Sequence, residues 1–252
     1  MKKNIRLILA VVMTALVTAS VTLSCLYSTG IFLSGNGSQY NPSQTEQQDS
    51  ALVDQSIVFV GSDLVTGSKA SGDSFVEYLR QSRGINAVVY GKDGASLVER
   101  GANSIPAMIK TIPTENANPR MILCEVPYID GTGFSRIGQI TDGYFNDQYD
   151  TKSVIGAMEF VISYSQDTWG CPVVFYTCQP NDNAHYAKIV DAVLMVADKW
   201  NVEVIDFYHD EGMVLDDRQQ ALYMATDSCP TKAGYKELYA PRFEEFLLKK
   251  IY

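Results

Sequence analysis

Histidine is almost absent from this sequence, with only His185 and His209 among 252 residues, and acidic residues outnumber lysine and arginine by 29 to 20. The five cysteines do not have the spacing of a metal site, and the chain contains no internal repeat. An acidic chain is repelled by nucleic acid, so we expect no nucleic-acid partner. We also expect no cofactor and no bound metal.

The first 45 residues contain no aspartate or glutamate, and the only charges near the start are Lys2, Lys3 and Arg6. An apolar stretch follows from residue 7 to about residue 33, a pattern typical of a signal sequence or signal anchor. The stretch is long enough to cross a bilayer, which takes about 20 residues. Its positive end predicts an exported domain, either secreted or anchored to the outer face of the cytoplasmic membrane.

Three fates of this leader stay open in the sequence. Val17-Thr18-Ala19 fits a cleavage site, an uncleaved leader would be a membrane anchor, and Cys25 weakly resembles a lipid attachment site. Without residues 1–33 the chain has 17 basic and 29 acidic residues, a formal charge of −12. That charge argues against adhesion to anionic lipid surfaces.

The sequence predicts three regions: a leader over residues 1–33, a flexible linker over 34–55 and one domain over 56–252. The linker is rich in Ser, Gln, Asn and Gly. In the domain, short apolar runs alternate with helical patterns, which predicts a parallel sheet covered on both faces. Strands are expected at 56–60, 86–90, 121–126, 172–177 and 202–207, and helices at 74–82, 103–111, 152–165, 184–200 and 233–251.

The first predicted strand, Ser56 to Val60, runs directly into Gly61-Ser62-Asp63. A buried strand followed by glycine, small polar residues and a helix is typical of a nucleophile elbow, which exposes one side chain at the carboxyl edge of a sheet. Ligand sites of such folds lie at that edge. The residues just after each strand are therefore the candidate site.

Several of these strand ends resemble blocks of the SGNH/GDSL hydrolases, in the right order over residues 56–252. The blocks are the elbow, YGKDGASL after the second strand, PYIDG after the third, and DSCPTKAGYKEL before the last helix. The resemblance implies a three-layer α/β/α sandwich with a five-stranded parallel sheet in the order 2-1-3-4-5. It also implies an ester hydrolase with a Ser-His-Asp triad.

The residues at the family's catalytic positions do not fit that activity. Asp63 stands at the nucleophile, Cys229 at the histidine, Thr226 at the aspartate and Ile129 at the oxyanion asparagine. Only Gly94, a backbone donor, is retained. We therefore expect a degenerate member without hydrolytic activity. The alternative is an active ester hydrolase, a carbohydrate esterase or deacetylase, with an unorthodox site.

That alternative depends on a small set of rescue residues. Ser62 would be the nucleophile if the turn shifted by one residue, and His209, after the fifth strand, would replace the missing base. Cys229 would need a nearby base or positive field to react. The literal Gly72-Asp73-Ser74 is a decoy, because it follows no strand and Ser74 begins a helix as a capping box with Glu77.

Acidic and aromatic side chains gather at the predicted strand ends. The candidate ligand-binding residues are Asp63, Gly94, Tyr128, Asp130 and Asp227, with Glu125 beside them. They would hold a sugar by hydrogen bonds and ring stacking, or a cation through the carboxylates. The structural alternative is that Asp130 accepts backbone N–H bonds and that Asp63 caps its turn. We expect a cell-wall or surface glycan as partner, and the membrane through the leader.

One further expectation comes from the strand order that the resemblance implies. It makes the fourth and fifth strands neighbours, which would bring Cys178, at the end of the fourth, toward Cys229 in the last loop. We predict that these two cysteines form a disulfide outside the cell.

Overall fold

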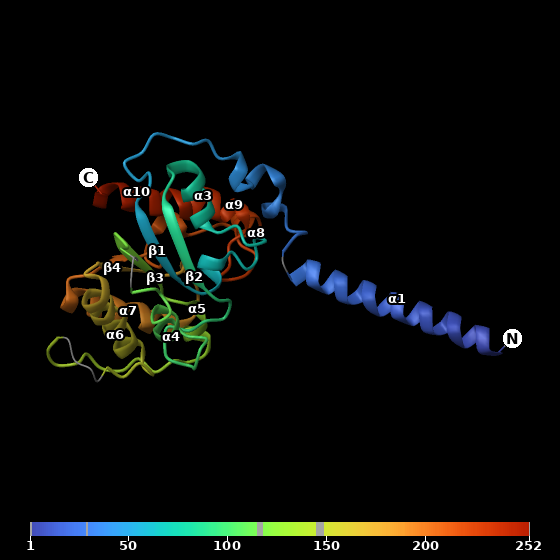
Figure 1. Cartoon of the computed structure of the whole chain (residues 1–252), viewed down its shortest axis with the longest axis horizontal. Coiled ribbons are helices and arrows are strands. Elements are labelled where there is room, and N and C mark those ends of the chain that lie inside the picture. Colours follow the sequence, from blue (N-terminus) through green and yellow to red (C-terminus); the bar gives the residue numbers. More distant parts are fainter. Residues whose placement is uncertain (1, 29, 115–117, 145–148, 252) are drawn as a thin grey trace.

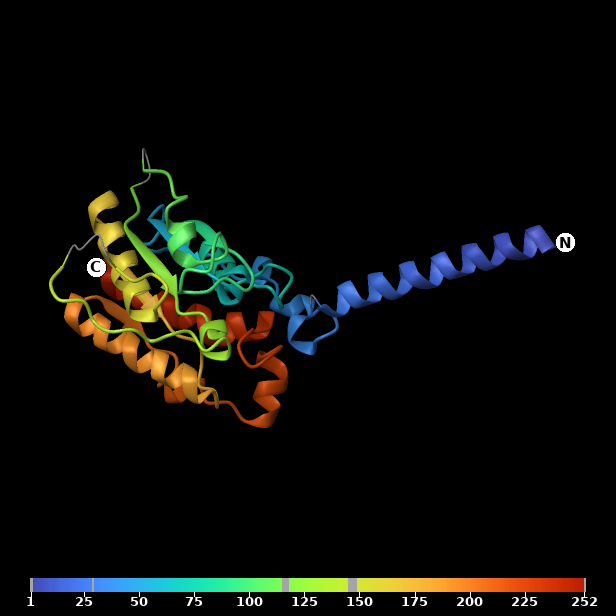
Figure 2. The same ribbon diagram turned by 90° about the horizontal axis from the view of Figure 1, so that it is seen from below.

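The computed structural model of the protein describes residues 2–28, 30–114, 118–144 and 149–251. One parallel sheet has the order β2-β1-β3-β4-β5, as the resemblance implied. Helices cover both faces of this sheet, so the architecture is the expected α/β/α sandwich (Figures 1 and 2). The strands are β1 (Ser56–Gly61), β2 (Asn86–Gly91), β3 (Met121–Glu125), β4 (Val173–Tyr176) and β5 (Glu203–Ile205).

The central strand β1 pairs with β2 on one side and with β3 on the other. Its residues Ile57 to Val60 are buried, which explains why the run is apolar without the alternation of a half-exposed strand. Because the pairing is parallel, β1 and β3 end at the same edge. Glu125, the last residue of β3, therefore lies beside the turn that follows β1.

The helices lie close to their predicted positions. The Ser74 hydroxyl accepts the Val76 N–H at 3.2 Å and Glu77 accepts the Ser74 N–H at 2.8 Å, so the predicted capping box is confirmed. Gly84, with φ +66°, ends the same helix in the left-handed conformation. The helices are α2 (Asp63–Thr66), α3 (Phe75–Arg83), α4 (Ile105–Ile109), α5 (Tyr128–Thr132), α6 (Val154–Trp169), α7 (Ala184–Trp200), α8 (Asp217–Tyr223), α9 (Lys232–Gly234) and α10 (Ala240–Ile251).

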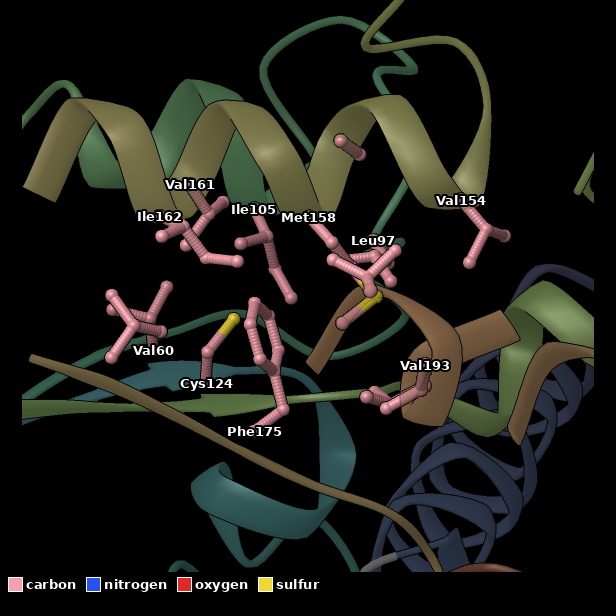
Figure 3. Close-up of a cluster of buried hydrophobic side chains, with 14 of the residues drawn as sticks. Val60, Leu97, Ile105, Cys124, Val154, Met158, Val161, Ile162, Phe175 and Val193 are labelled. Atoms are coloured by element: carbon pink, nitrogen blue, oxygen red, sulfur yellow. The ribbon is translucent and has the colours of Figure 1, made fainter. Parts of the chain in front are cut away.

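The core has two halves, one on each face of the sheet. On one face, α6 places Met158, Val161 and Ile162 over Cys124 and Phe175 of the sheet (Figure 3). On the other face the half-core is rich in aromatic rings from α3, the sheet and α10. Figure 1 shows α3 and α10 on the face opposite α6 and α7. Burial of both faces explains the apolar strands.

The predicted helix over 233–251 is divided into three parts. Between α9 and α10 lies a π-helical turn, η5 (Tyr235–Tyr239). The Tyr235 hydroxyl donates to the Leu64 carbonyl at 2.9 Å, and the Tyr239 hydroxyl donates to the Gln179 side chain. Both tyrosines are fully buried, so the wider turn brings two rings to the carboxyl edge of the sheet.

The prediction of a flexible linker over 34–55 is wrong, because this segment is folded against the domain. It contains three 3-10 helices, η1 (Ser34–Asn36), η2 (Ser38–Tyr40) and η3 (Pro42–Gln44), and Leu52 is fully buried. The polar composition that suggests a tether instead supplies hydrogen bonds to the domain. We call residues 30–44 the collar.

The leader forms one long helix, α1 (Lys2–Ser28), which projects away from the domain (Figure 1). Its segment Ile8–Tyr27 is long and apolar enough to cross a membrane, and none of it is buried against the domain. A signal sequence and an anchor share these properties, so the choice between them is not made by length and composition.

Candidate functional site

The turn after β1 is built around the buried carboxyl group of Glu125. Its oxygens accept N–H bonds from three residues of the turn, Ser62 at 2.7 Å, Val65 at 3.2 Å and Leu64 at 3.4 Å. A Cβ on Gly61 would lie 2.5 Å from Glu125 Oε2, so only glycine fits there. These bonds satisfy free donors at the start of α2 and fix the direction in which Asp63 points.

Burial raises the pKa of Glu125 to about 8, and the nearby charge of Asp63 adds to that rise. The three N–H donors act in the opposite direction. Glu125 is therefore mainly neutral near pH 7. The sequence placed Glu125 among the acidic groups of the cleft, and in the structure its carboxyl group also holds the turn.

The Asp63 carboxylate lies where the resemblance places the reacting centre of a hydrolase. Its Oδ2 accepts the Gly94 N–H at 3.1 Å and the Ser62 hydroxyl at 3.0 Å. Gly94 has φ +68°, in the loop after β2, and points its N–H at the elbow. The backbone donor expected to hold a reaction oxyanion is thus already bonded to an anion of the protein itself.

The other positions matched to the family's triad do not form one. The Thr226 hydroxyl accepts the Cys229 N–H at 3.1 Å and the Ser228 N–H at 3.4 Å, so it stabilises its own turn. Burial raises the pKa of the Cys229 thiol, which keeps it protonated. Its sulfur lies 3.8 Å from the Ser68 hydroxyl. None of these groups can take a proton as histidine does.

The two rescue residues, Ser62 and His209, each form a hydrogen bond with a nearby carboxylate. Ser62 is 1% exposed and its hydroxyl donates to Asp63. His209 Nδ1 lies 2.7 Å from Asp206 Oδ2 at the surface, and His209 lines neither of the two cavities described below. His185 Nε2 lies 2.8 Å from the Ser135 carbonyl.

Asp130 is a structural residue, which corrects its place among the predicted ligand-binding residues. It is fully buried, and its carboxylate accepts the Leu97 N–H and the Ser135 hydroxyl, both at 2.6 Å. These bonds fix the loop after β2 to α5. The alternative reading of Asp130, as a partner of backbone N–H groups, is the one the structure supports.

Two neighbouring cavities open at the carboxyl edge of the sheet. The smaller, which we call the pit, measures about 230 Å³, and the larger, which we call the groove, about 590 Å³. Tyr128 lines both. The pit is lined by Asp63, Leu64, Glu125, Tyr128, Ile129, Thr132, Cys178 and Ser228. The groove is lined by Tyr128, Gln179, Pro180, Asn181, Asp182, Asn183, Met213, Val214, Leu215, Gln220 and Asp227.

The groove combines amide, carboxylate and apolar side chains with one tyrosine ring. The Tyr128 ring lies 5.6 Å from that of Tyr186, whose hydroxyl joins the ends of β3 and β4 through the Val126 carbonyl and the Cys178 N–H. No lysine, arginine or histidine of the described residues lines either cavity. No cluster of metal-ligating side chains occurs in the described residues.

Sequence reasoning found the groove only in part. It named Tyr128 and Asp227 but not QPNDN, residues 179–183, which is separated from the end of β4 only by residues 177 and 178 and forms one wall. The rule that sites lie at the carboxyl ends of parallel strands was the available signal for that wall. The other wall comes from residues 213–220, which have no strand directly before them.

Cys178 and Cys229 are both buried and both free thiols in the structure. The Cys178 sulfur accepts a hydrogen bond from the Asn181 amide at 3.3 Å. Burial raises the pKa of Cys178 to about 12 and is the main reason that it stays protonated. The disulfide between these residues is not formed in this structure, and the pairing stays a prediction.

Comparison with known proteins identifies structures that share this fold. No family model and no curated protein matches the chain. Many solved structures share its fold at low sequence identity. A putative GDSL-like lipase from Bacteroides ovatus is 14% identical with a TM-score of 0.54, over 78% of this chain and 99% of that one. An active-site mutant of a family two carbohydrate esterase from Clostridium thermocellum, in complex with a cello-oligosaccharide, is 13% identical with a TM-score of 0.56.

That second alignment covers 79% of this chain and 64% of the esterase. A third structure, 14% identical with a TM-score of 0.51, covers 77% of this chain and 68% of a carbohydrate esterase. Its active site is described as having divergent catalytic and non-catalytic binding functions. The sheet order and these structures together show that the chain has the SGNH/GDSL hydrolase-like fold.

Proposed function

We propose that this protein is a non-hydrolytic glycan-binding member of the SGNH/GDSL-like fold that acts outside the cell. The observation that carries the proposal is the bond from the Gly94 N–H to the carboxylate of Asp63. An acyl-transfer enzyme keeps such a donor free for the negative oxygen that develops during the reaction.

A carboxylate in this position opposes ester hydrolysis in two ways. It occupies a donor, and its charge repels the oxyanion of a tetrahedral intermediate. Loss of a single oxyanion donor costs about 10²–10³ in rate in a characterised protease. Here the side-chain donor is also missing at Ile129, and neither Thr226 nor Cys229 supplies a base.

The groove supports the binding half of the proposal. Sugars are bound by side-chain amides and carboxylates that hydrogen-bond hydroxyl groups and by an aromatic ring on which a pyranose stacks. The groove offers both, because the carboxylates of Asp182 and Asp227 line it and Tyr128 lies at the junction with the pit. The amides of Gln179 and Asn181 are held by hydrogen bonds within the protein, so they shape the wall. The esterase of similar fold that was solved with a cello-oligosaccharide is consistent with such a ligand.

The binding test uses isothermal titration or glycan arrays with neutral oligosaccharides, cellohexaose among them. We expect binding that weakens at least tenfold in Tyr128→Ala and in Asp182→Ala. Tyr144→Ala is the matched control, because Tyr144 is an exposed tyrosine that does not line the groove, and it should bind as wild type. Equal affinities in all three variants would refute the groove as the binding site.

The hydrolysis test separates this proposal from an active carbohydrate esterase. The protein should not turn over acetyl esters or acetylated glycans. Turnover that is lost in Ser62→Ala or Asp63→Ala would overturn the proposal in favour of an unorthodox esterase. A variant with Asp63→Ser, Ile129→Asn, Thr226→Asp and Cys229→His restores the expected residues, and activity gained by it would support the assignment of these positions.

A further inference from the structure

The collar joins the apolar helix to the domain without a free tether. The span ends at Tyr27, and the chain is hydrogen-bonded to the domain from Asn36. The Asn36 side chain donates to the carbonyls of Gly30 at 2.8 Å and Lys69 at 2.7 Å, and it accepts the Lys232 N–H at 2.8 Å. One part-buried amide thus ties the first turn after the helix to two separate parts of the domain.

Further contacts continue along the collar. Gly35 is buried so tightly that a Cβ would lie 1.9 Å from the Leu222 carbonyl oxygen. The Lys232 ammonium donates to the Asn41 side chain at 2.8 Å. The hydroxyl of Tyr78 donates to the Tyr40 carbonyl at 2.5 Å. The collar is therefore part of the folded body.

The outer side of this junction is apolar and uncharged. Tyr27 is 78% exposed, Ile31 51% and Phe32 62%, although the collar inside them is packed. Residues 30–44 include no charged side chain, in a protein whose exported part has a formal charge of −12. Aromatic residues at the end of an apolar span are typical of the membrane–water interface.

We propose that the collar is a membrane-seating surface, which holds the domain directly against the outer face of the bilayer with Ile31 and Phe32 in the lipid interface. The partner is the lipid bilayer crossed by α1. Continuity with the span supports this choice, because three residues separate Tyr27 from the apolar pair. The absence of charge lets the collar approach lipid headgroups that would repel the rest of this acidic surface.

The seating also fixes where the groove lies. Gly35 packs on the backbone of α8 at Leu222, and Gln220 of the same short helix lines the groove. Figure 1 shows α8 and α9 on the side of the domain from which α1 leaves. The groove is therefore held near the bilayer, and its ligand would be a polymer close to the membrane surface.

The first test places a fluorophore in the collar. The full chain carrying Phe32→Trp is reconstituted in phosphatidylcholine nanodiscs, with or without bromine in the acyl chains. We expect brominated lipid to quench the added emission at least twofold. Phe134→Trp is the control, because Phe134 is 77% exposed beyond α5, and its added emission should not change. No quenching at residue 32, or equal quenching at both positions, would overturn the proposal.

The second test measures amide exchange of the full chain in the same nanodiscs. The Lys232 N–H should be protected in wild type and should exchange at least tenfold faster in Asn36→Ala, which removes its acceptor and frees the collar. Unprotected exchange in wild type would overturn the rigid collar. Mass spectrometry of the protein from its native membranes supplies a further check, because a chain that begins after residue 32 would also overturn the proposal.

Discussion

The stability of this protein should fall as pH rises from 5 to 8, because of Glu125. Its pKa is raised from 4.5 to about 8 by burial, whereas in the unfolded chain the group ionises at its ordinary value. Between these two values the folded state holds a proton that the unfolded state has released. The stabilisation is fully present below about pH 4.5 and is lost as pH rises through the folded pKa.

The magnitude follows from the width of that window. Each pKa unit corresponds to about 1.4 kcal/mol, so the loss in free energy of unfolding between pH 5 and pH 8 is at most about 4 kcal/mol. Domains are stable by only about 5–15 kcal/mol, so the change is large enough to measure. Urea unfolding at half-unit steps of pH, on the chain from residue 30 onward, gives the curve.

Two variants distinguish the contribution of Glu125 to the pH dependence of stability from that of every other titrating group. Glu125→Gln cannot ionise, so its pH slope between 5 and 8 should be nearly flat. Its stability at pH 5 should fall by about 1–3 kcal/mol, because the amide has one acceptor oxygen for three N–H donors.

Glu159→Gln is the control, since Glu159 is also buried but has a lowered pKa. Burial alone would raise the pKa of Glu159, but hydrogen bonds from Lys199, Thr141 and Trp200 outweigh that effect. The stability that Glu159 contributes is present above pH 4.5 and is lost below it. This variant should therefore keep the wild-type slope from pH 5 to 8. A wild-type slope that Glu125→Gln does not change would refute the argument.

Three other predictions concern stability and redox state. Ser74→Ala removes the cap of α3 and should lower the free energy of unfolding by about 1 kcal/mol in urea titrations, whereas a change near zero would contradict the importance of the cap. Phe243→Ala removes a fully buried ring stacked 3.9 Å from that of Phe75 and should cost about 3–5 kcal/mol in the same assay, and a loss below 1 kcal/mol would contradict the packing. Thiol counting on denatured, unreduced protein tests the predicted disulfide: we expect the thiols of Cys178 and Cys229 to be missing, and two reactive thiols at these positions, as in the structure, would contradict the pairing.

Sequence patterns predicted the helices and strands well wherever the residues that cause the structure are close together in the sequence. The capping box at Ser74 and Glu77 depends on four adjacent residues, and the structure forms it as written. The strand at 56–60 is apolar because both faces of the sheet are covered, so its composition reports its environment directly. The long helix at 184–200 has the bounds that its periodicity predicted.

Composition gave a wrong prediction for a segment whose polar residues have partners distant in the sequence. The segment 34–55 has the Ser, Gln, Asn and Gly content of a tether, but Asn36 bonds to residues 69 and 232. Water would satisfy the hydrogen bonds of the same amide equally well. Only the folded domain supplies the carbonyl and N–H groups that make it a structural residue.

The sequence alone determined the fold class, the strand order through its resemblance, and which residues stand at the family's catalytic positions. The tertiary structure decided what those residues do. Asp63 could have pointed into solvent as a free carboxylate, and Glu125 could have lined the cleft without any bond to the turn. The fold brings the Gly94 N–H to Asp63, 31 residues away in the sequence. It also brings Glu125 to the N–H groups of the same turn, 60 or more residues away. Hydrogen bonds depend on distance and direction in space, which no local pattern in a sequence records.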